Sequence, residues 1–411
     1  MSTFDALRLH PKLAQALAAK EFTTPTPVQA QAIPPIMNGE EVMACAPTGT
    51  GKTAAFVLPA LHRILSHPAP KGHGPRVLVL TPTRELAQQV MENVRLFGKH
   101  AGIRTGAIVG GVGYGPQFQL LRNPLDMLVA TPGRLIDHLE QDRIDFSRIE
   151  MVVLDEADKM LDMGFLKPVQ RILKAADDKA ARLQVLLFSA TFTDSVNKFA
   201  AKALIDPVRI ELASAKVDHS QITQKAFRSD GAAHKMLMLE ELLKNPAVTQ
   251  AIVFRATKHG SDKLANQLEK MGHKAAALHG GMKQNARKRT LDALQHGKVR
   301  VLVATDVAAR GIDVKGLSHV INFDLPQVAE DYIHRIGRTG RAGETGQALS
   351  LIAPSDVPML KDIEKLLGKR IEMAFMPGFE PELSQADFSQ QGAKAPRTFK
   401  TKPRGGARRR A

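Results

Sequence analysis

Residues 41–65 read EVMACAPTGTGKTAAFVLPALHRIL, and this stretch decides the fold class of the first half of the chain. It begins with a short apolar run, passes through a loop of small residues and continues as an amphipathic helical pattern. Small residues let backbone N–H groups approach phosphate oxygens, and the N-terminus of the next helix adds partial positive charge. The stretch therefore predicts a strand, a phosphate-binding loop and a helix. A glycine-rich turn without a ligand is the alternative, because Ala46 stands where the strict loop pattern has Gly.

The loop supplies the first candidate site residues. We expect Lys52 to contact the β- and γ-phosphates of a nucleotide and Thr53 to bind a magnesium ion. The candidate nucleotide-binding residues of the loop are Ala46, Pro47, Thr48, Gly49, Thr50, Gly51, Lys52 and Thr53.

A second stretch, MVVLDEAD at residues 151–158, has an apolar strand pattern with carboxylates at its C-terminal end. In open parallel sheets, ligands bind outside the carboxyl ends of the strands, which is also the edge where the phosphate loop begins. We therefore expect Asp155 to hold magnesium and Glu156 to orient or deprotonate the attacking water. An acidic helix cap is the alternative for these carboxylates.

Short apolar runs alternate with helix-length segments along the whole chain. Runs of this kind, bounded by Gly, Pro or Asp, indicate parallel strands that are buried on both faces. The fold class is therefore α/β, with two tandem doubly wound parallel sheets. The expected strands are 41–45, 76–80, 127–130, 151–154 and 184–188 in the first sheet and 251–254, 300–304, 319–323 and 348–352 in the second.

Two composition changes divide the chain. The segment DPVRIELASAKVDHS, residues 206–220, has one short apolar alternation and no amphipathic face, which suits a linker. After about Phe375 the chain turns to Pro, Gly, Ser, Gln and basic residues, which is typical of a disordered tail. We therefore expect a first domain at 1–207, a linker at 208–220, a second domain at 221–375 and a basic flexible tail at 376–411.

Charge favours a polyanionic partner. The chain of 411 residues has 57 basic and 41 acidic side chains, a formal charge of +16, which favours nucleic acid through counterion release. Residues 391–411 carry eight Lys or Arg and no acid, half of the excess charge, although a solvated tail would show the same composition. Only 5% of residues are aromatic and none is Trp, which argues against a stacking platform for bases.

Cysteine usage and hydropathy indicate the compartment. Cys45 is the single cysteine, so no internal disulfide can form, and no Cys/His cluster has metal-site spacing. The first residues lack a signal-peptide pattern, and no apolar run approaches the roughly 18 to 20 residues that span a bilayer. We expect a cytoplasmic protein with no membrane partner that acts as a monomer.

Taken together, the motifs resemble the DEAD-box family over residues 4 to 353. Besides the phosphate loop and DEAD at 155–158, they are SAT at 189–191, ATDVAARGID at 304–313 and HRIGRTGR at 334–341. The resemblance implies two RecA-like domains and an ATP-dependent RNA helicase that uses ATP and Mg²⁺. The expected activity is RNA-stimulated ATP hydrolysis coupled to local, non-processive separation of RNA strands or remodelling of ribonucleoprotein.

The resemblance extends the nucleotide site beyond the loop. Residues of about 2–30 would form an adenine-reading segment, in which Gln29 can bond adenine bidentately and Phe22 packs on the base. Asp313 is similar to the residue that meets the ribose, and Arg338 and Arg341 are similar to arginine fingers that act on the γ-phosphate. A basic loop that holds RNA is the alternative for these two arginines. The departures from the family pattern are Glu21, Thr24 and Pro47.

The same resemblance implies an RNA face in each domain and a set of residues that couple the sites. Most of the RNA candidates can position phosphates or sugars without reading bases. The RNA-binding candidates are Pro82, Thr83, Arg84, Gly111, Thr131, Gly133 and Arg134 in the first domain, and Arg255, Thr257, Gly281, Thr305, Asp306 and Arg310 in the second. The coupling candidates are Asp158, Ser189, Thr191 and His334.

Two other functions remain open at this point. A DNA helicase would share the nucleotide site, and a non-catalytic RNA clamp or annealing protein would use ATP only as a ligand. The motif set looks most similar to bacterial family members that act in ribosome assembly and RNA turnover. The expected partners are therefore structured or ribosomal RNA, with ribosome-assembly or RNA-decay proteins.

Overall fold

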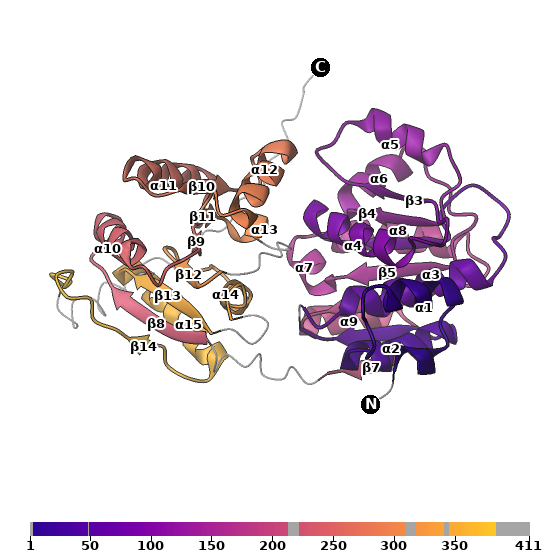
Figure 1. The fold of residues 1–411 in the computed structure, drawn as a ribbon, viewed down its shortest axis with the longest axis horizontal. Helices are drawn as coiled ribbons and strands as arrows, with labels where there is room; N and C mark the ends of the chain where they lie inside the picture. Colours follow the sequence, from indigo (N-terminus) through magenta and orange to yellow (C-terminus); the bar gives the residue numbers. More distant parts are fainter. Residues whose placement is uncertain (1–2, 48, 213–221, 310–316, 341–344, 384–411) are drawn as a thin grey trace, which may run out of the picture. The chain divides into compact units, whose positions relative to one another are not determined.

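The chain forms two compact units, residues 1–218 and 219–411, in a computed structural model (Figure 1). The structure describes residues 3–47, 49–212, 222–309, 317–340 and 345–383. Each unit is a parallel sheet with helices on both faces, which confirms the predicted α/β class.

Within the described residues, seven parallel strands form the sheet of the first unit in the order β3-β4-β2-β5-β6-β1-β7. Every residue of β1, β2, β4, β5 and β6 is buried, as expected for strands that are covered on both faces. The strands are β1 Val42–Cys45, β2 Val77–Leu80, β3 Thr105–Ile108, β4 Met127–Ala130, β5 Met151–Asp155, β6 Gln184–Ser189 and β7 Val208–Glu211.

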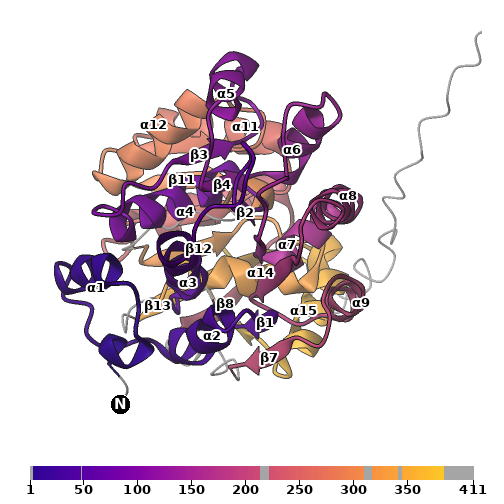
Figure 2. The ribbon, with the colours of Figure 1, turned by 90° about the vertical axis from the view of Figure 1, so that its right-hand side faces the viewer.

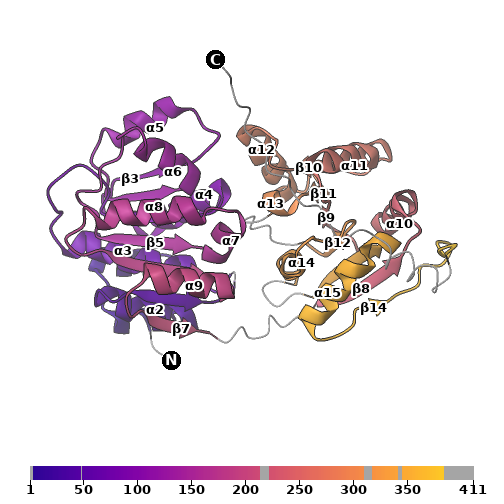
Figure 3. The same cartoon turned by 180° about the vertical axis from the view of Figure 1, so that it is seen from behind.

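Helices cover both faces of this sheet. Figure 2 shows α1 and α3 on one side of the strands and α8 and α9 on the other, and α8 and α9 lie in front in Figure 3. Alternate residues of the strands divide between the two cores; in β2, Val77 packs with α1–α4 and Leu78 packs with α6–α9. The helices are α1 Pro11–Ala18, α2 Pro27–Met37, α3 Lys52–Ser66, α4 Arg84–Phe97, α5 Tyr114–Leu121, α6 Pro132–Leu139, α7 Ala157–Asp162, α8 Leu166–Asp177 and α9 Asp194–Ala203, with a 3₁₀ turn at Phe4–Leu7.

The second unit repeats this topology. In the described part of the chain its seven parallel strands lie in the order β10-β11-β9-β12-β13-β8-β14, so each strand of the first unit has a counterpart seven strands later. The strands are β8 Ile222–Arg228, β9 Ala251–Phe254, β10 Ala275–Leu278, β11 Val301–Ala304, β12 His319–Asn322, β13 Gly346–Ile352 and β14 Glu372–Met373.

The helices of the second unit also divide between the two faces. Those that pack with the core around Val253 are α10 and α11, while α12 to α15 pack on the opposite face. The helices are α10 Ala232–Lys244, α11 Lys258–Lys270, α12 Gln284–Gln295, α13 Asp306–Ala309, α14 Ala329–Ile336 and α15 Val357–Leu367, with a 3₁₀ turn at Pro354–Asp356. No helix in the described ranges is long and apolar enough to cross a membrane.

Two expected boundaries differ from the structure. Residues 208–211 were expected to begin the linker, but they form β7, which pairs with β1. Residues 376–383 were expected to belong to the tail, but Met376 and Phe379 pack on the core of the second unit. The backbone N–H groups of Glu382 and Leu383 also donate to Asp230, at 2.9 and 3.2 Å. The rest of the expected linker, 213–220, and of the tail, 384–411, lies outside the described residues.

Candidate functional site

The predicted phosphate loop joins the end of β1 to the start of α3. Gly49 and Gly51 adopt left-handed φ values of 88° and 91°, which side chains rarely adopt. A Cβ on Gly51 would also lie 2.4 Å from Nε2 of Gln29, so only glycine fits there. The loop is therefore a cradle of backbone at a helix N-terminus, the arrangement that binds phosphate. Thr48 lies outside the described residues.

Two polar side chains of the loop bond to its own backbone. Lys52, the first residue of α3, is buried, and its Nζ donates to the carbonyl oxygen of Ala46 at 2.7 Å. Thr50 donates to the carbonyl oxygen of Pro47, also at 2.7 Å. At the end of β1, the thiol of Cys45 donates to the carbonyl oxygen of Ala190 at 3.3 Å. The Lys52 ammonium is thus held at the loop, where a phosphate could replace the carbonyl as its partner.

The predicted adenine-reading segment is attached to this loop. Gln29 is buried, accepts from the backbone N–H of Thr26 at 2.9 Å and donates to the carbonyl oxygen of Gly51 at 3.1 Å. The first contact completes a capping box at the start of α2. Phe22 is 47% exposed, with its ring centroid 6.3 Å from that of Phe97. Sequence reasoning missed the link to Gly51, which couples Gln29 directly to the phosphate loop.

The two carboxylates expected to act on water and metal lie at the end of β5. Asp155 is buried at the last position of the strand, and Glu156 follows in the left-handed conformation at φ 54°. Burial, with the neighbouring charge of Glu156, raises the pKa of Asp155 to about 7, although Lys52 and Lys159 oppose the shift. A buried carboxylate oxygen that lacks full charge compensation is a donor that fits Mg²⁺, and the Thr53 hydroxyl at the start of α3 is another oxygen donor.

A buried ion pair holds Glu156. Nζ of Lys159 lies 2.6 Å from Oε1 of Glu156, and the side chains are 1% and 5% exposed. The two residues are three apart, a spacing that places side chains on one face of a helical turn. Lys159 is a functional candidate that sequence reasoning missed, and this spacing was the signal that could have found it.

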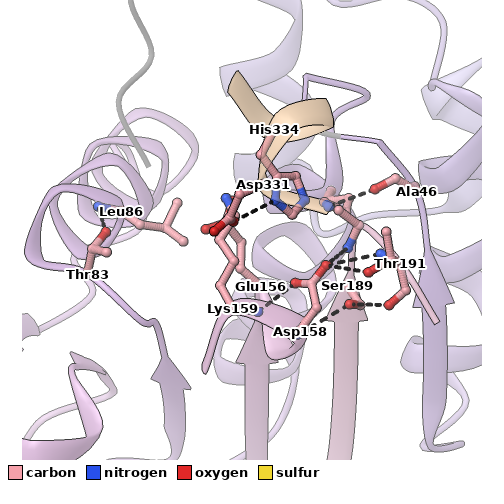
Figure 4. A network of polar contacts seen from close by, with 12 residues as sticks. Ala46, Thr83, Leu86, Glu156, Asp158, Lys159, Ser189, Thr191, Asp331 and His334 are labelled. Atoms are coloured by element: carbon pink, nitrogen blue, oxygen red, sulfur yellow. Dashed lines mark hydrogen bonds and ion pairs between the residues drawn. The ribbon is translucent and has the colours of Figure 1, made fainter. Parts of the chain in front are cut away.

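The predicted coupling residues Asp158, Ser189 and Thr191 form one network (Figure 4). Oδ2 of Asp158 accepts from the backbone N–H groups of Ala190 and Thr191 and from the Thr191 hydroxyl, at 3.0 to 3.2 Å. Ser189 accepts from the backbone N–H of Asp158 and donates to the carbonyl oxygen of Thr191. The network joins the loop after β5 to the loop after β6. The fourth coupling candidate, His334, belongs to α14 of the second unit, where its Nδ1 lies 3.6 Å from Asp331.

The RNA candidates of the first unit follow β2, β3 and β4. After β2 and Pro82, Thr83 caps α4 by accepting from the N–H of Leu86 at 3.2 Å. Arg84 extends over the turn after β3, because a Cβ on Gly111 would lie 1.9 Å from its Nη1. Gly111 also has a left-handed φ of 71°.

The loop after β4 joins the same surface. Thr131 accepts from the N–H of Gly110 at 3.3 Å, which ties this loop to the turn after β3. After Gly133, Arg134 donates to the carbonyl oxygen of Val112 at 2.7 Å and lies 4.1 Å over the ring of Tyr114. The predicted residues of the first unit are thereby brought onto adjacent loops.

The RNA candidates of the second unit follow the three corresponding strands. After β9, Thr257 caps α11 by accepting from Gly260 at 3.0 Å, with backbone angles close to those of Thr83. After β10, the N–H of Gly281 donates to His279 Nδ1 at 3.1 Å. Thr305 follows β11 and is buried. Thr83, Gly111 and Thr131 thus have counterparts in Thr257, Gly281 and Thr305.

Two RNA candidates of the second unit are engaged within it. Arg255 pairs with Asp324 at 2.7 Å and lies over Phe323. Both carboxylate oxygens of Asp306 accept from Arg335, at 2.5 and 2.7 Å. Arg335 is buried and also donates to Asn322 at 2.9 Å, and sequence reasoning assigned it no role.

Of the two predicted arginine fingers, the structure describes Arg338. It follows α14 and is 7% exposed. Arg310, Asp313 and Arg341 lie outside the described residues, so their predicted roles are not placed by the structure.

Comparison with known proteins decides the family. The chain is 42% identical to the ATP-dependent RNA helicase SrmB of Escherichia coli (strain K12), over 95% of this chain and 88% of that protein. The chain belongs to the DEAD-box family of ATP-dependent RNA helicases. Residues 26–199 match the family model described as DEAD/DEAH box helicase, and residues 234–343 match the helicase conserved C-terminal domain. The helicase is also 39% identical to the DEAD-box ATP-dependent RNA helicase RhpA of Helicobacter pylori (strain B128), over 91% of this chain and 74% of that protein.

Solved structures agree with this assignment. The helicase is similar to S. cerevisiae Dbp5 bound to RNA and ADP BeF3, with a TM-score of 0.79 and 33% identity over 93% of this chain and 96% of that chain. The resemblance stated from the motifs is therefore confirmed, as are the tandem RecA-like fold and the ATP-dependent helicase activity.

Proposed function

We propose that the helicase couples RNA-stimulated ATP hydrolysis to local, non-processive separation of RNA strands or remodelling of ribonucleoprotein. The observation that carries the proposal is the arrangement of the first sheet. The phosphate loop, the buried carboxylates and the Asp158 network follow β1, β5 and β6, which are neighbours in the sheet. The RNA candidates follow β3, β4 and β2 on the same edge. One sheet edge therefore offers both a nucleotide site and an RNA site.

In this proposal each side chain of the nucleotide site has one task. Lys52 exchanges the carbonyl of Ala46 for the β- and γ-phosphates, and Gln29 reads adenine from its position beside Gly51. Asp155 and Thr53 would hold Mg²⁺, which neutralises charge on the phosphates when it is bound. Glu156 orients the attacking water and accepts its proton.

The second unit contributes to the reaction through arginine. We propose that Arg338 and Arg341 stabilise charge on the transferring phosphoryl group, and that Asp313 meets the ribose. His334 and Asp158 couple this step to RNA. Hydrolysis then requires both units, so ATP and RNA that both engage the two units should each tighten binding of the other by reciprocal linkage.

RNA recognition is proposed to use the backbone. Thr83 and Thr257 accept from helix N–H groups, yet each hydroxyl proton can still donate to a phosphate. Such contacts position a strand without reading its sequence. We further propose that the helicase is a cytoplasmic monomer that acts in ribosome assembly or RNA turnover, as the motif resemblance implies. Crosslinking in cells and sequencing of the bound RNA would test this role.

The nucleotide assignment is tested by two variants with different expected defects. Lys52→Ala should abolish nucleotide binding, since it removes a phosphate contact. Glu156→Gln should keep ATP and RNA bound while hydrolysis stops, since it spares those contacts. Normal hydrolysis by Glu156→Gln would refute the role of Glu156. Stimulation of the wild-type ATPase by DNA as strongly as by RNA would favour a DNA helicase instead.

A further inference from the structure

The side chain of Glu156 is held at one oxygen only. Oε1 accepts from Nζ of Lys159 at 2.6 Å. Oε2 is buried and has no hydrogen-bond partner within the described residues. A buried polar atom without a partner is costly, so such atoms in native proteins usually serve a ligand or a reaction. The two oxygens of this carboxylate therefore have different surroundings.

The backbone also restricts Glu156. Its left-handed conformation, with φ 54° and ψ 51°, is uncommon for a residue with a side chain, and such strain gathers at functional sites. The N–H of Met160 donates to the carbonyl oxygen of Glu156 at 3.1 Å, which anchors the residue to the first turn of α7. Lys159 lies on that same turn. One helical turn thus sets both the backbone and the side chain of Glu156.

We propose that Lys159 is a positioning residue for hydrolysis: it holds Oε1 of Glu156, so that Oε2 is the atom presented to the attacking water. The inference rests on the proposed role of Glu156 as the group that orients water. Lys159 itself touches neither nucleotide nor water. Because its stem is buried with its charge, the ammonium has few alternative positions, and the carboxylate that it bonds is oriented before ATP arrives.

The test compares Lys159→Met in two backgrounds. Methionine keeps the length of the buried stem and removes the charged donor. In the otherwise wild-type chain, the single-turnover rate at saturating ATP and RNA should fall about 10- to 100-fold, as for other residues that orient a reacting group from behind. Affinities for ATP and for RNA without nucleotide should not change, because no ligand contact is removed. Lys159→Arg, which restores a charged donor, should recover part of the rate.

The second background is Glu156→Gln. If Lys159 acts through Glu156, Lys159→Met should cause no further loss in this background, since residues that act as a unit are not additive. Equal fold-losses in both backgrounds would overturn the proposal, because they would show a general structural effect. Weaker ATP binding that accounts for the whole loss, or faster hydrolysis without RNA, would overturn it too.

Controls separate folding from function. Thermal unfolding of each variant shows whether the chain remains folded, and Lys159→Gln, which keeps a polar donor, replaces Lys159→Met if that variant does not fold. The two proposals fail differently. Normal hydrolysis by Glu156→Gln would refute the role of Glu156, whereas slow hydrolysis by Glu156→Gln with a normal rate for Lys159→Met would refute only the role of Lys159.

Discussion

The two units differ most at the strands that correspond to β1 and β8. In the first unit β1 leads into the glycine-rich loop of residues 46–51, and Lys52 begins α3. In the second unit β8 is followed by residues 229–231 alone before α10 begins, and the nearby buried Lys235 pairs with Asp356 at 2.5 Å. The shared sheet thus carries a nucleotide loop in one copy and a structural ion pair in the other. Chemistry here lies in the loops, and the sheet only positions them.

The largest effect is expected from Arg338, which would show that the second unit acts on ATP without a loop of its own. Arg338→Ala should lower RNA-stimulated turnover by about 10³- to 10⁵-fold, the range known for arginine fingers. Nucleotide affinity and nucleotide-free RNA affinity should survive, and Arg338→Lys should rescue poorly because an ammonium lacks the planar fork. Turnover should be measured beside both affinities. Lost RNA binding with normal turnover at saturating RNA would instead identify a basic loop that holds RNA.

The two buried lysines provide the next test of the comparison. Lys235→Met should destabilise the second unit by about 3–5 kcal/mol, because it leaves the carboxylate of Asp356 buried without its partner. Lys52→Met should cost little stability but remove nucleotide binding. Urea unfolding and nucleotide binding of both variants would check this. If Lys235→Met abolished nucleotide binding while the chain stayed folded, the second unit would hold a nucleotide site that we do not assign.

A smaller effect should reveal what the units have in common. Lys258 begins α11 after the capping Thr257, as Arg84 begins α4 after Thr83, and a Cβ on Gly281 would lie 3.6 Å from its Cδ. Each of Arg84→Ala and Lys258→Ala should therefore weaken RNA binding and reduce the log–log salt slope by about 0.7, the value for one phosphate contact on a single strand. Lys270→Ala, at the other end of α11, is the matched control. An effect of Arg84→Ala alone would break the equivalence of the two surfaces.

The smallest effect concerns His138 of α6, which lies between Tyr114 and Phe118 with both ring nitrogens lacking partners in the described residues. Burial, with the charges of Arg134 and Arg143, lowers its pKa. The unfolded chain therefore takes up this proton first, and the first unit should lose up to about 1.4 kcal/mol per pH unit as pH falls below 6.5.

His138→Phe should remove this acid sensitivity, since the ring makes no hydrogen bond to lose. Hydrogen exchange of the α6 amides, corrected for the intrinsic rate at each pH, measures it, and His100→Gln at an exposed position is the control. An unchanged pH profile in His138→Phe would assign the acid sensitivity to other groups.

Composition determined which strands could be predicted. The strands rich in branched apolar residues were expected, apart from small shifts at their ends, whereas β3 (TGAI) and β10 (AAAL) were missed because Gly and Ala have low strand preference. These segments are strands because β4 and β11 pair with them. β7 was missed for a similar reason: only two of its residues are apolar, and its pairing with β1 supplies the rest.

Site residues that belong to a contiguous motif were predicted, whereas their distant partners were not. The loop of residues 46–53 and the carboxylates of 155–158 are visible in the sequence because neighbouring positions share one task. The bond of Gln29 to Gly51 spans 22 positions and that of Arg335 to Asp306 spans 29. Such pairs depend on how loops meet at the edge of a sheet, which neither periodicity nor spacing reports.

The single cysteine has a practical consequence for fluorescence experiments. Cys45 is 7% exposed, and burial raises the pKa of its thiol, which keeps little of the reactive thiolate at neutral pH. Maleimide dyes should therefore leave it unmodified in the folded chain. A pair of surface cysteines, one introduced in each unit, could then be labelled without removing Cys45, and energy transfer between the dyes would report the distance between the units through a catalytic cycle.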